Sequence, residues 1–222
     1  MKGKSDPERF EAIWGRFQEA PAALGHTPGA RDEWRRGRDR YAVWVFRVTE
    51  PAVLERLSLA RRALRGHIEP MTERDPHVTT FVSGFPVSDP ALDDDVGEAA
   101  LEATIASLKA DPPLAPRVIV GGLNAFLSCA FLEVLDLDDE LNRIRDRLSA
   151  TLREVRFSAY VPHVTAGLFE STPTGPIAEL IRPLRRLPPL AYQPAILELV
   201  EFDARHQGAD LITRAAIELP IR

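Results

Sequence analysis

The chain has 222 residues, of which 45% are hydrophobic and 27% charged, and this composition is typical of a globular protein with one sizeable core. A formal net charge of −5 argues against a protein that binds long duplex nucleic acid through a basic surface, but it allows a nucleotide or short RNA end in a local positive cleft. The chain shows no apolar run of membrane-spanning length and no signal-like N-terminus, and its one cysteine, Cys129, cannot pair internally. We therefore expect a cytoplasmic protein with no membrane partner.

Residues 1–40 are predicted to form an N-terminal extension. Apolar side chains recur at helical spacing over residues 5–20, and Pro21 ends the pattern. Residues 25–40 are rich in glycine and arginine, which is typical of a linker. We expect the helix to dock onto the rest of the protein, which we interpret as a single domain over residues 41–222.

The remaining sequence predicts strands and helices in a repeated order. The predicted elements are a strand over 41–48, a helix over 51–65, a strand over 77–85, a helix over 93–109, strands over 117–123 and 126–135, a helix over 138–153, a strand over 163–169, a helix over 177–184 and strands over 195–202 and 211–219. We interpret Asp93, Asp94 and Asp95 as a helix start rather than a metal site, because they are consecutive and precede a helical pattern. The order helix, strand, helix, hairpin occurs twice, which predicts two similar lobes.

One four-residue stretch occurs twice, each time at the start of a predicted strand. Pro76-His77-Val78-Thr79 returns 86 residues later as Pro162-His163-Val164-Thr165. Residues two apart in a strand share a face, so each strand presents an imidazole beside a hydroxyl. Both could be core strands with inward-facing histidines, but a duplicated motif in a chain with 5 histidines disfavours that reading.

This pair of motifs suits chemistry on a phosphodiester. If two related lobes face each other, two imidazoles and two hydroxyls converge on one cleft. Displacement at phosphorus requires one proton to be removed and another delivered, and histidine can do either near neutral pH. Threonine hydroxyls can donate hydrogen bonds to the phosphoryl oxygens. Two histidines without an HExxH spacing or a nearby carboxylate make a poor metal site, so we expect no metal and no cofactor.

The two His-x-Thr strands resemble the 2H phosphoesterase superfamily, and within it the 2′-5′ RNA ligase and cyclic phosphodiesterase-like family. The resemblance runs from about Tyr41 to the C-terminus. It implies an α+β, bilobal fold in which two pseudo-symmetric lobes of antiparallel sheet, flanked by helices, surround a central cleft. It also implies substrates such as 2′,3′-cyclic phosphates, 2′-5′ linked RNA or related nucleotides, and it implies four catalytic residues, namely His77, Thr79, His163 and Thr165.

The chain departs from many relatives after the second motif. Those relatives carry a basic residue there that helps to hold phosphate, whereas residues 166–170 of this chain are not basic. Arg74 and Arg156 are close to the motifs in sequence and are candidate replacements, although arginines are usually solvated.

Three aromatic residues are candidates for stacking on a nucleotide base. Strand alternation places Phe81 on the face of His77 and Phe169 on the face of His163, although core packing is the commoner role of such residues. Tyr160 lies in a loop-like stretch three residues before His163.

Two functions of different kinds therefore remain open. The first is a metal-independent phosphodiesterase that uses two histidines as acid and base. The second is a nucleotide-binding module that uses the same cleft without turnover. For either function we expect a monomer whose partner is a nucleotide or a short RNA with a cyclic phosphate end. The sequence leaves open the natural substrate and the choice between hydrolysis and ligation.

Overall fold

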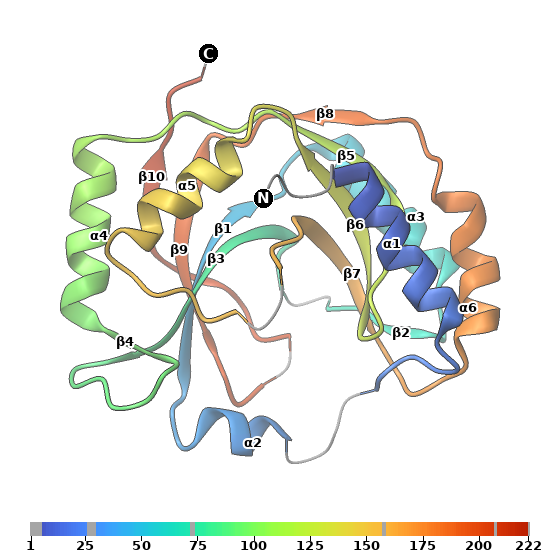
Figure 1. Cartoon of the computed structure of the whole chain (residues 1–222), viewed down its shortest axis with the longest axis horizontal. Helices are drawn as coiled ribbons and strands as arrows, with labels where there is room; N and C mark the ends of the chain where they lie inside the picture. The colour runs from blue at the N-terminus through green and yellow to red at the C-terminus, as the bar shows by residue number, and fades with distance from the viewer. Residues whose placement is uncertain (1–5, 26–29, 72–73, 157–158, 207, 222) are drawn as a thin grey trace.

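The computed structural model describes residues 6–25, 30–71, 74–156, 159–206 and 208–221. Eight of the described strands lie side by side in one sheet, with the bounds β1 (Arg40–Arg47), β3 (His77–Val87), β5 (Val118–Ala125), β6 (Cys129–Asp136), β7 (His163–Phe169), β8 (Leu190–Tyr192), β9 (Ile196–Asp203) and β10 (Ile212–Glu218). Along the sheet they follow the order β10-β9-β1-β3-β7-β6-β5-β8, and neighbouring strands are antiparallel (Figure 1). The sheet and its flanking helices form the predicted α+β fold.

Two short strands and several helices complete the described part of the chain. β2 (Ile68–Glu69) pairs with β7, and β4 (Asp95–Gly97) pairs with β3. The helices are α1 (Asp6–Glu19), α2 (Ala30–Arg35), α3 (Pro51–Ala63), α4 (Glu98–Ala110), α5 (Glu140–Ser149) and α6 (Thr174–Ile181), which continues into the 3-10 turn η1 (Arg182–Leu184). The sequence predicts the longer elements, whereas β2, β4 and β8 are too short to show a periodic pattern.

The two repeats of the chain are interlocked in the sheet. The β5–β6 hairpin follows β3 in sequence but pairs with β7, whereas the β9–β10 hairpin follows β7 but pairs with β1. The helices are exchanged in the same way, since α3 packs on β7 and α5 packs on β3. The two predicted lobes are therefore two halves of one sheet, and each half contains segments of both repeats.

The two halves meet where the repeated motifs lie. Val78 of β3 is opposite Val164 of β7, and this is the single registered pair between the two strands. Because both strands begin at their motifs and run in opposite directions, they overlap only there and then diverge (Figure 1). The motif tripeptides thus form the centre of the sheet.

The two faces of the sheet are packed differently. The largest hydrophobic cluster contains Val78 and Val164 and lies on the face opposite the motif histidines. Two smaller clusters lie on the motif face, because they contain Val45, the strand partner of Thr79, and Phe131, the strand partner of Thr165. The N-terminal extension contributes to both small clusters, through Trp34 of α2 and through Phe10 and Ile13 of α1.

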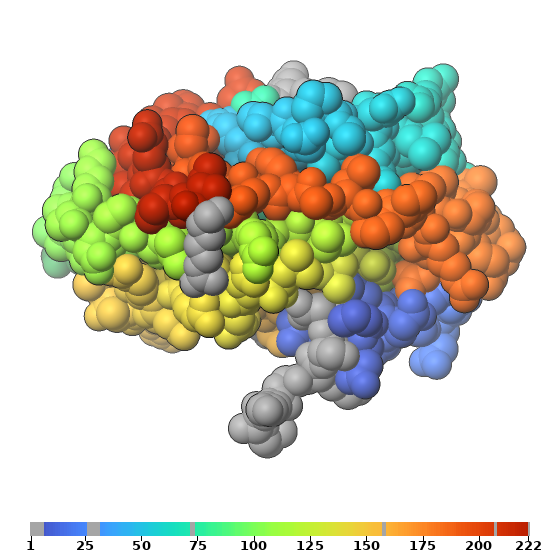
Figure 2. Space-filling view, turned by 90° about the horizontal axis from the view of Figure 1, so that it is seen from above, coloured from blue at the N-terminus to red at the C-terminus, as the bar shows by residue number. Residues whose placement is uncertain are grey.

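Helix α1 docks onto the protein, as its amphipathic pattern predicts. It packs against β5, β6 and α6, and Figure 2 shows it (blue) lying against the α6 segment (orange). Its apolar side chains Phe10, Ile13, Trp14 and Phe17 are all buried.

The prediction of a linker over residues 25–40 is wrong in part. Residues 26–29 lie outside the described residues, but α2 follows them and is anchored by Trp34. The Trp34 ring lies 4.7 Å from the ring of Tyr41 and 4.8 Å from the ring of Phe85. A single tryptophan among charged residues gives no helical period, which is why the sequence missed this contact.

The prediction that Asp93, Asp94 and Asp95 start a helix is also wrong. Helix α4 begins at Glu98, after Gly97, and has no side-chain cap. Asp94 and Asp95 instead form ion pairs with Arg38, which stacks on the Phe85 ring at 3.7 Å. The acids are therefore held by a guanidinium group from the N-terminal extension.

Two further expectations concern the cysteine and membrane-spanning segments. Cys129 is buried, and burial raises the pKa of its thiol to about 12. None of the helices within the described residues has the length and apolar character needed to cross a membrane.

Candidate functional site

The four motif side chains lie on one face of the sheet. Val78 is opposite Val164 in an antiparallel pair, so His77 lies beside Thr165 and His163 lies beside Thr79. The two valines are buried on the other face, where they belong to the main core. The structure thus brings together the residues that the two motifs predict.

Within this group the two imidazoles are diagonal neighbours, and so are the two hydroxyls. Diagonal neighbours in an antiparallel pair are separated by roughly 7 to 8 Å. This separation leaves room for one phosphoryl group between His77 and His163, with a hydroxyl on either side. The arrangement is a consequence of the register, because a shift by one residue would turn one motif to the other face.

Both histidines are held in the same tautomer by the same local contact. His77 Nδ1 lies 2.8 Å from the carbonyl oxygen of Asp75, and His163 Nδ1 lies 2.7 Å from the carbonyl oxygen of Val161. A carbonyl oxygen can only accept, so each Nδ1 carries the hydrogen and each Nε2 carries the lone pair. The repeated proline after each carbonyl residue gives the chain the extended conformation that precedes the strand.

The pKa of His77 is lowered to about 4. Burial is the largest cause, and the hydrogen bond to Asp75 opposes it. The positive charges of Arg74 and Arg47 lower the pKa as well, as does the charge of His163.

The pKa of His163 is also lowered, chiefly by burial and further by the charge of Arg156, while its hydrogen bond to Val161 opposes the shift. Two aromatic rings form its immediate surroundings. The ring centroid of Phe126 lies 5.2 Å from that of His163, and the ring centroid of Phe131 lies 5.3 Å away. Both contacts are edge-to-face, and they fix the plane of the imidazole.

The two threonine hydroxyls complete the group. Thr79 and Thr165 are partly buried, and neither hydroxyl makes a hydrogen bond to another of the described residues. A hydroxyl can donate one hydrogen bond, so both can donate to an oxygen placed between the imidazoles.

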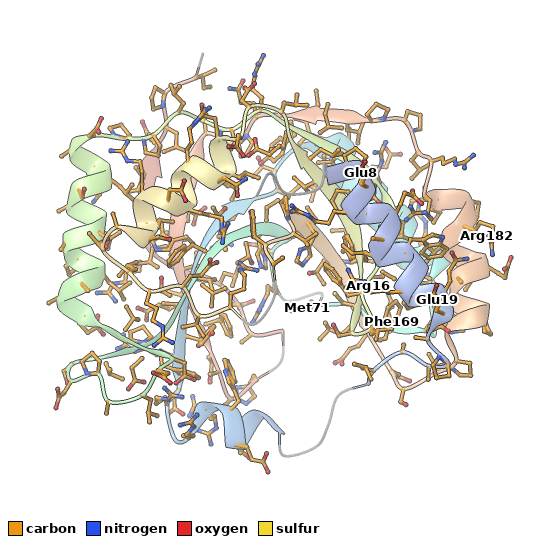
Figure 3. All side chains as sticks on the ribbon, viewed as in Figure 1. Glu8, Arg16, Glu19, Met71, Phe169 and Arg182 are labelled. Carbon is orange, nitrogen blue, oxygen red and sulfur yellow. The ribbon has the colours of Figure 1, made fainter. Side chains whose placement is uncertain are left out.

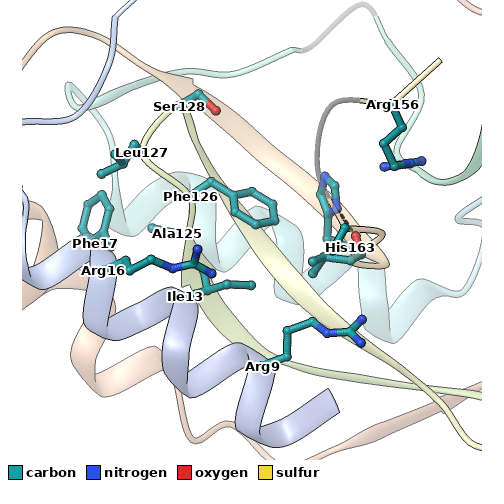
Figure 4. A pocket seen from close by; sticks show the side chains of 12 residues that line it. Arg9, Ile13, Arg16, Phe17, Ala125, Phe126, Leu127, Ser128, Arg156 and His163 are labelled. Atoms are coloured by element: carbon teal, nitrogen blue, oxygen red, sulfur yellow. Dashed lines mark hydrogen bonds between the residues drawn. The ribbon is translucent and has the colours of Figure 1, made fainter. Parts of the chain in front are cut away.

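A pocket opens beside His163 (Figure 4). Its volume is about 540 Å³, within the usual range for small-molecule sites. The wall from the sheet includes Phe126, Leu127 and Ser128 of the β5–β6 loop, and Arg156 lies near His163. The opposite wall is α1, which contributes Arg9, Ile13, Arg16 and Phe17. The sequence missed Phe126, Arg9 and Arg16; the signal for the arginines is their spacing of seven residues on a helix.

The two candidate arginines each lie near one histidine. Arg74 donates to the carbonyl oxygen of Ala209 and stacks on the Phe202 ring at 4.2 Å, and its charge acts on His77. Arg156 lines the pocket and forms an ion pair with Glu154 at 2.8 Å.

The predicted positions of Phe81 and Phe169 are wrong. Both rings are buried in the main core, on the face of Val78 and Val164. The physical reason is a β-bulge directly after each motif, which adds one residue and reverses the face of the side chains that follow. In β3 the extra residue is Thr80, because Val45 is opposite Thr79 while Trp44 is opposite Phe81.

The bulge in β7 occupies the equivalent position. Phe131 is opposite Thr165 and Ala130 is opposite Gly167, so Ala166 is the extra residue. Arg61 of α3 donates to the carbonyl oxygen of Ala166 at 3.0 Å, which satisfies a group that the bulge removes from the ladder. The two repeats therefore share the bulge as well as the motif.

Tyr160 does not offer an open ring to a base. Its side chain is buried, and the guanidinium groups of Arg145 and Arg156 stack on its ring at 4.2 and 5.0 Å. Its carbonyl oxygen accepts a hydrogen bond from Arg9. Tyr160 thus supports two arginines rather than lining the pocket.

Across the described ranges of the chain, no group of three or more His, Cys, Asp or Glu side chains is arranged to hold a metal ion. The donors around the motifs are imidazole, hydroxyl and guanidinium groups.

Fold and site together define a class of protein: an α+β protein whose antiparallel sheet carries paired His-x-Thr strands at its centre. The chain belongs to the 2′-5′ RNA ligase superfamily, whose sequence model matches residues 48–206. This confirms the resemblance to the 2H phosphoesterases. No curated protein sequence matches the chain.

One solved structure supports the fold. The chain is similar to E. coli LigT complexed with 3′-AMP, with a TM-score of 0.52 and 12% sequence identity over 82% of this chain and 99% of that one. E. coli LigT complexed with NADP+ matches with a TM-score of 0.46 and 13% identity over 82% of this chain and 98% of that one. At this identity the similarity concerns the fold.

Proposed function

We propose that the protein is a metal-independent phosphodiesterase that acts on 2′,3′-cyclic phosphates or on 2′-5′ linked RNA or nucleotides. The observation that carries this proposal is the register of Val78 with Val164, which places two imidazoles at opposite corners of one group and two hydroxyls at the others. Membership of the 2′-5′ RNA ligase superfamily supports the same reaction class.

The proposed hydrolysis uses one imidazole at each end of an in-line displacement. One neutral imidazole removes a proton from water through Nε2 as the water oxygen bonds to phosphorus. The other, protonated imidazole gives its proton to the ribose oxygen as the bond from that oxygen to phosphorus breaks. The product is a monoester, and the two histidines have exchanged protonation states. Ligation would follow the same course, with a ribose hydroxyl in place of water as the nucleophile and a diester as the product.

The lowered pKa values bear on how the acid is formed. Both histidines have pKa values below the ordinary 6.5, so both imidazoles are neutral at pH 7 in the free protein. A phosphodiester anion bound between them favours the charged form and raises both pKa values. Substrate binding thus favours uptake of a proton from solvent by the imidazole that acts as the acid, while Thr79 and Thr165 donate to the non-bridging oxygens.

The nucleoside belongs in the pocket beside His163. Phe126 is partly exposed there, and one side of its ring is stacked on Phe131 at a centroid distance of 4.2 Å. The other side of the ring is the surface that we assign to the base, in place of Tyr160, Phe81 and Phe169. Arg156, which lines the same pocket, is the cation that we assign to the phosphate, and Arg74 is assigned to the His77 side.

The direct test is incubation of the full-length protein with adenosine 2′,3′-cyclic phosphate in EDTA. We expect a monoester product that is absent with the matched His163→Asn variant. Saturable binding without product would support the nucleotide-binding module instead. A rate that appears only after a divalent metal is restored would contradict the metal-independent mechanism.

A further inference from the structure

Helix α1 is an addition to the part of the chain that carries the motifs. The superfamily match begins at residue 48, whereas α1 ends at Glu19. Nevertheless α1 forms one wall of the pocket at His163 (Figure 4). An added segment that lines a reaction site can alter which substrates the site accepts.

The helix is anchored firmly enough to hold side chains over the pocket. Phe17 is buried and stacks on Phe169 of β7 with ring centroids 5.5 Å apart. Phe10 is buried, and its ring centroid lies 6.2 Å from that of Phe131, whose own ring contacts His163. These contacts connect α1 to the two strands that form the His163 half of the site.

The pocket side of α1 is cationic. Arg9, Ile13 and Arg16 are four and three residues apart, so they lie on one side of the helix, and all three line the pocket. The guanidinium groups of Arg9 and Arg16 extend from the helix towards the pocket in Figure 4. Arg9 donates a hydrogen bond to the carbonyl oxygen of Tyr160 at 2.8 Å. This bond holds the Arg9 guanidinium group beside the segment that leads into the second motif.

Arg16 has no acidic partner within the described part of the chain. Its one hydrogen bond there goes to the carbonyl oxygen of Ala12 in its own helix, at 3.3 Å. By contrast Arg182, the first residue of η1, forms an ion pair with Glu179 of α6 at 2.8 Å. Figure 3 shows Arg16 on the inner side of α1 and Arg182 on the outer side of the molecule.

We propose that α1 makes the protein selective for substrates that carry a second phosphate, bound by Arg16 and Arg9 across the nucleoside from the phosphodiester at the histidines. This inference rests on the proposed function, and it adds the class of substrate. The fitting substrate is a nucleotide with a cyclic phosphate on its 2′ and 3′ oxygens and a phosphate on its 5′ oxygen, as at the end of an RNA strand.

Charge and shape both point to this substrate. A phosphate group fits the two arginines better than a neutral group does, because its oxygens accept paired hydrogen bonds from a guanidinium group. Figure 4 shows His163 on one side of the pocket and Arg16 on the facing helix, so a phosphodiester at the motif side chains leaves Arg16 available to a second phosphate. Between the two charged ends, Phe126, Ile13 and Phe17 provide an apolar surface for the nucleoside.

The test compares two adenosine 2′,3′-cyclic phosphates, one with a 5′-phosphate and one without. We expect the wild-type protein to show a KM about tenfold lower for the 5′-phosphorylated compound, the size expected for one charge-assisted hydrogen bond. Arg16→Gln should reduce the ratio of the two KM values towards one. The matched control, Arg182→Gln, should keep the wild-type ratio. Equal KM values in the wild-type protein, or an unchanged ratio in Arg16→Gln, would overturn the inference.

A binding measurement separates this inference from the proposed function. If neither cyclic compound is turned over, the phosphodiesterase proposal fails, and calorimetry with adenosine 3′,5′-bisphosphate and adenosine 3′-monophosphate still tests α1. Tighter binding of the bisphosphate that is lost in Arg16→Gln would support the second phosphate site. Equal affinity for both compounds in the wild-type protein would contradict it.

Discussion

The two halves of the site carry the same motif in different surroundings. On the first half, the strand neighbour of His77 is Arg47, and Arg74 acts on the same imidazole. On the second half, the rings of Phe126 and Phe131 surround His163, and α1 closes a pocket over them. The comparison suggests that the repeat supplies the chemistry, whereas the unrepeated neighbours decide what is bound and where.

The strongest way to break this comparison is to remove one imidazole from each half. His77→Ala and His163→Ala should each lower kcat by about 10²- to 10⁴-fold, because each removes the general acid or the general base of the proposed reaction. The measurement is turnover of adenosine 2′,3′-cyclic phosphate by folded variants. His206→Ala, which changes an exposed histidine of the turn after β9, should keep the wild-type rate. A near wild-type rate in either motif variant would exclude the two-histidine mechanism.

Removal of the Thr79 or the Thr165 hydroxyl should lower kcat by similar amounts, and each by less than removal of an imidazole. Thr79→Val and Thr165→Val keep the shape of the side chain but remove a donor, and each should lower kcat by about 100-fold. Thr79→Ser and Thr165→Ser retain the hydroxyl and should recover most of the loss. Valine variants as active as the wild type would show that the hydroxyls do not contact the transition state.

Variants of two phenylalanines test whether the base is bound at the His163 half of the site. Phe126→Leu should raise KM by about 5- to 10-fold with little change in stability, since a stacking surface for the base is lost. Phe81→Leu should leave KM unchanged but lower the free energy of unfolding by roughly 1 to 3 kcal/mol, because Phe81 is fully buried in the main core. Steady-state kinetics and urea unfolding of both variants measure the two effects. The reverse pattern would restore the role that strand alternation predicts for Phe81.

The smallest expected effect is on stability in acid. The pKa of His77 is about 4 in the folded protein, below the ordinary 6.5 of an unfolded chain. Between these values the unfolded state binds more protons, so the stability that is present above pH 6.5 is lost as the pH falls towards 4. His77→Asn removes this contribution, and its free energy of unfolding should fall less than that of the wild type between pH 7 and pH 5. Equal losses in urea unfolding would show that the pKa of His77 is not lowered.

Local sequence patterns predicted the central part of the site. The two His-x-Thr stretches, their positions at strand starts and the repeated order of elements are all properties of short segments. The sharing of one face by His77 and Thr79 follows from strand periodicity alone. The α+β class follows from the same patterns together with the resemblance to a known superfamily.

The surroundings of the site depend on contacts between distant segments, which sequence periodicity does not contain. The bulges at Thr80 and Ala166 exist only relative to the partner strands, so strand alternation alone puts Phe81 and Phe169 on the wrong face. The exchange of hairpins between the halves is likewise a property of pairing. Arg16 lines the pocket because α1 docks beside it. The apolar pattern of α1 predicts that one side of the helix is buried, but it does not predict where the helix docks.

The most direct test of the central claim is an NMR titration of the histidine side chains with and without adenosine 3′-monophosphate. If both motifs act on one phosphorus atom, the bound phosphate should raise the pKa values of His77 and His163 together. A shift confined to one of the two motif histidines would show that the imidazoles do not face the same group.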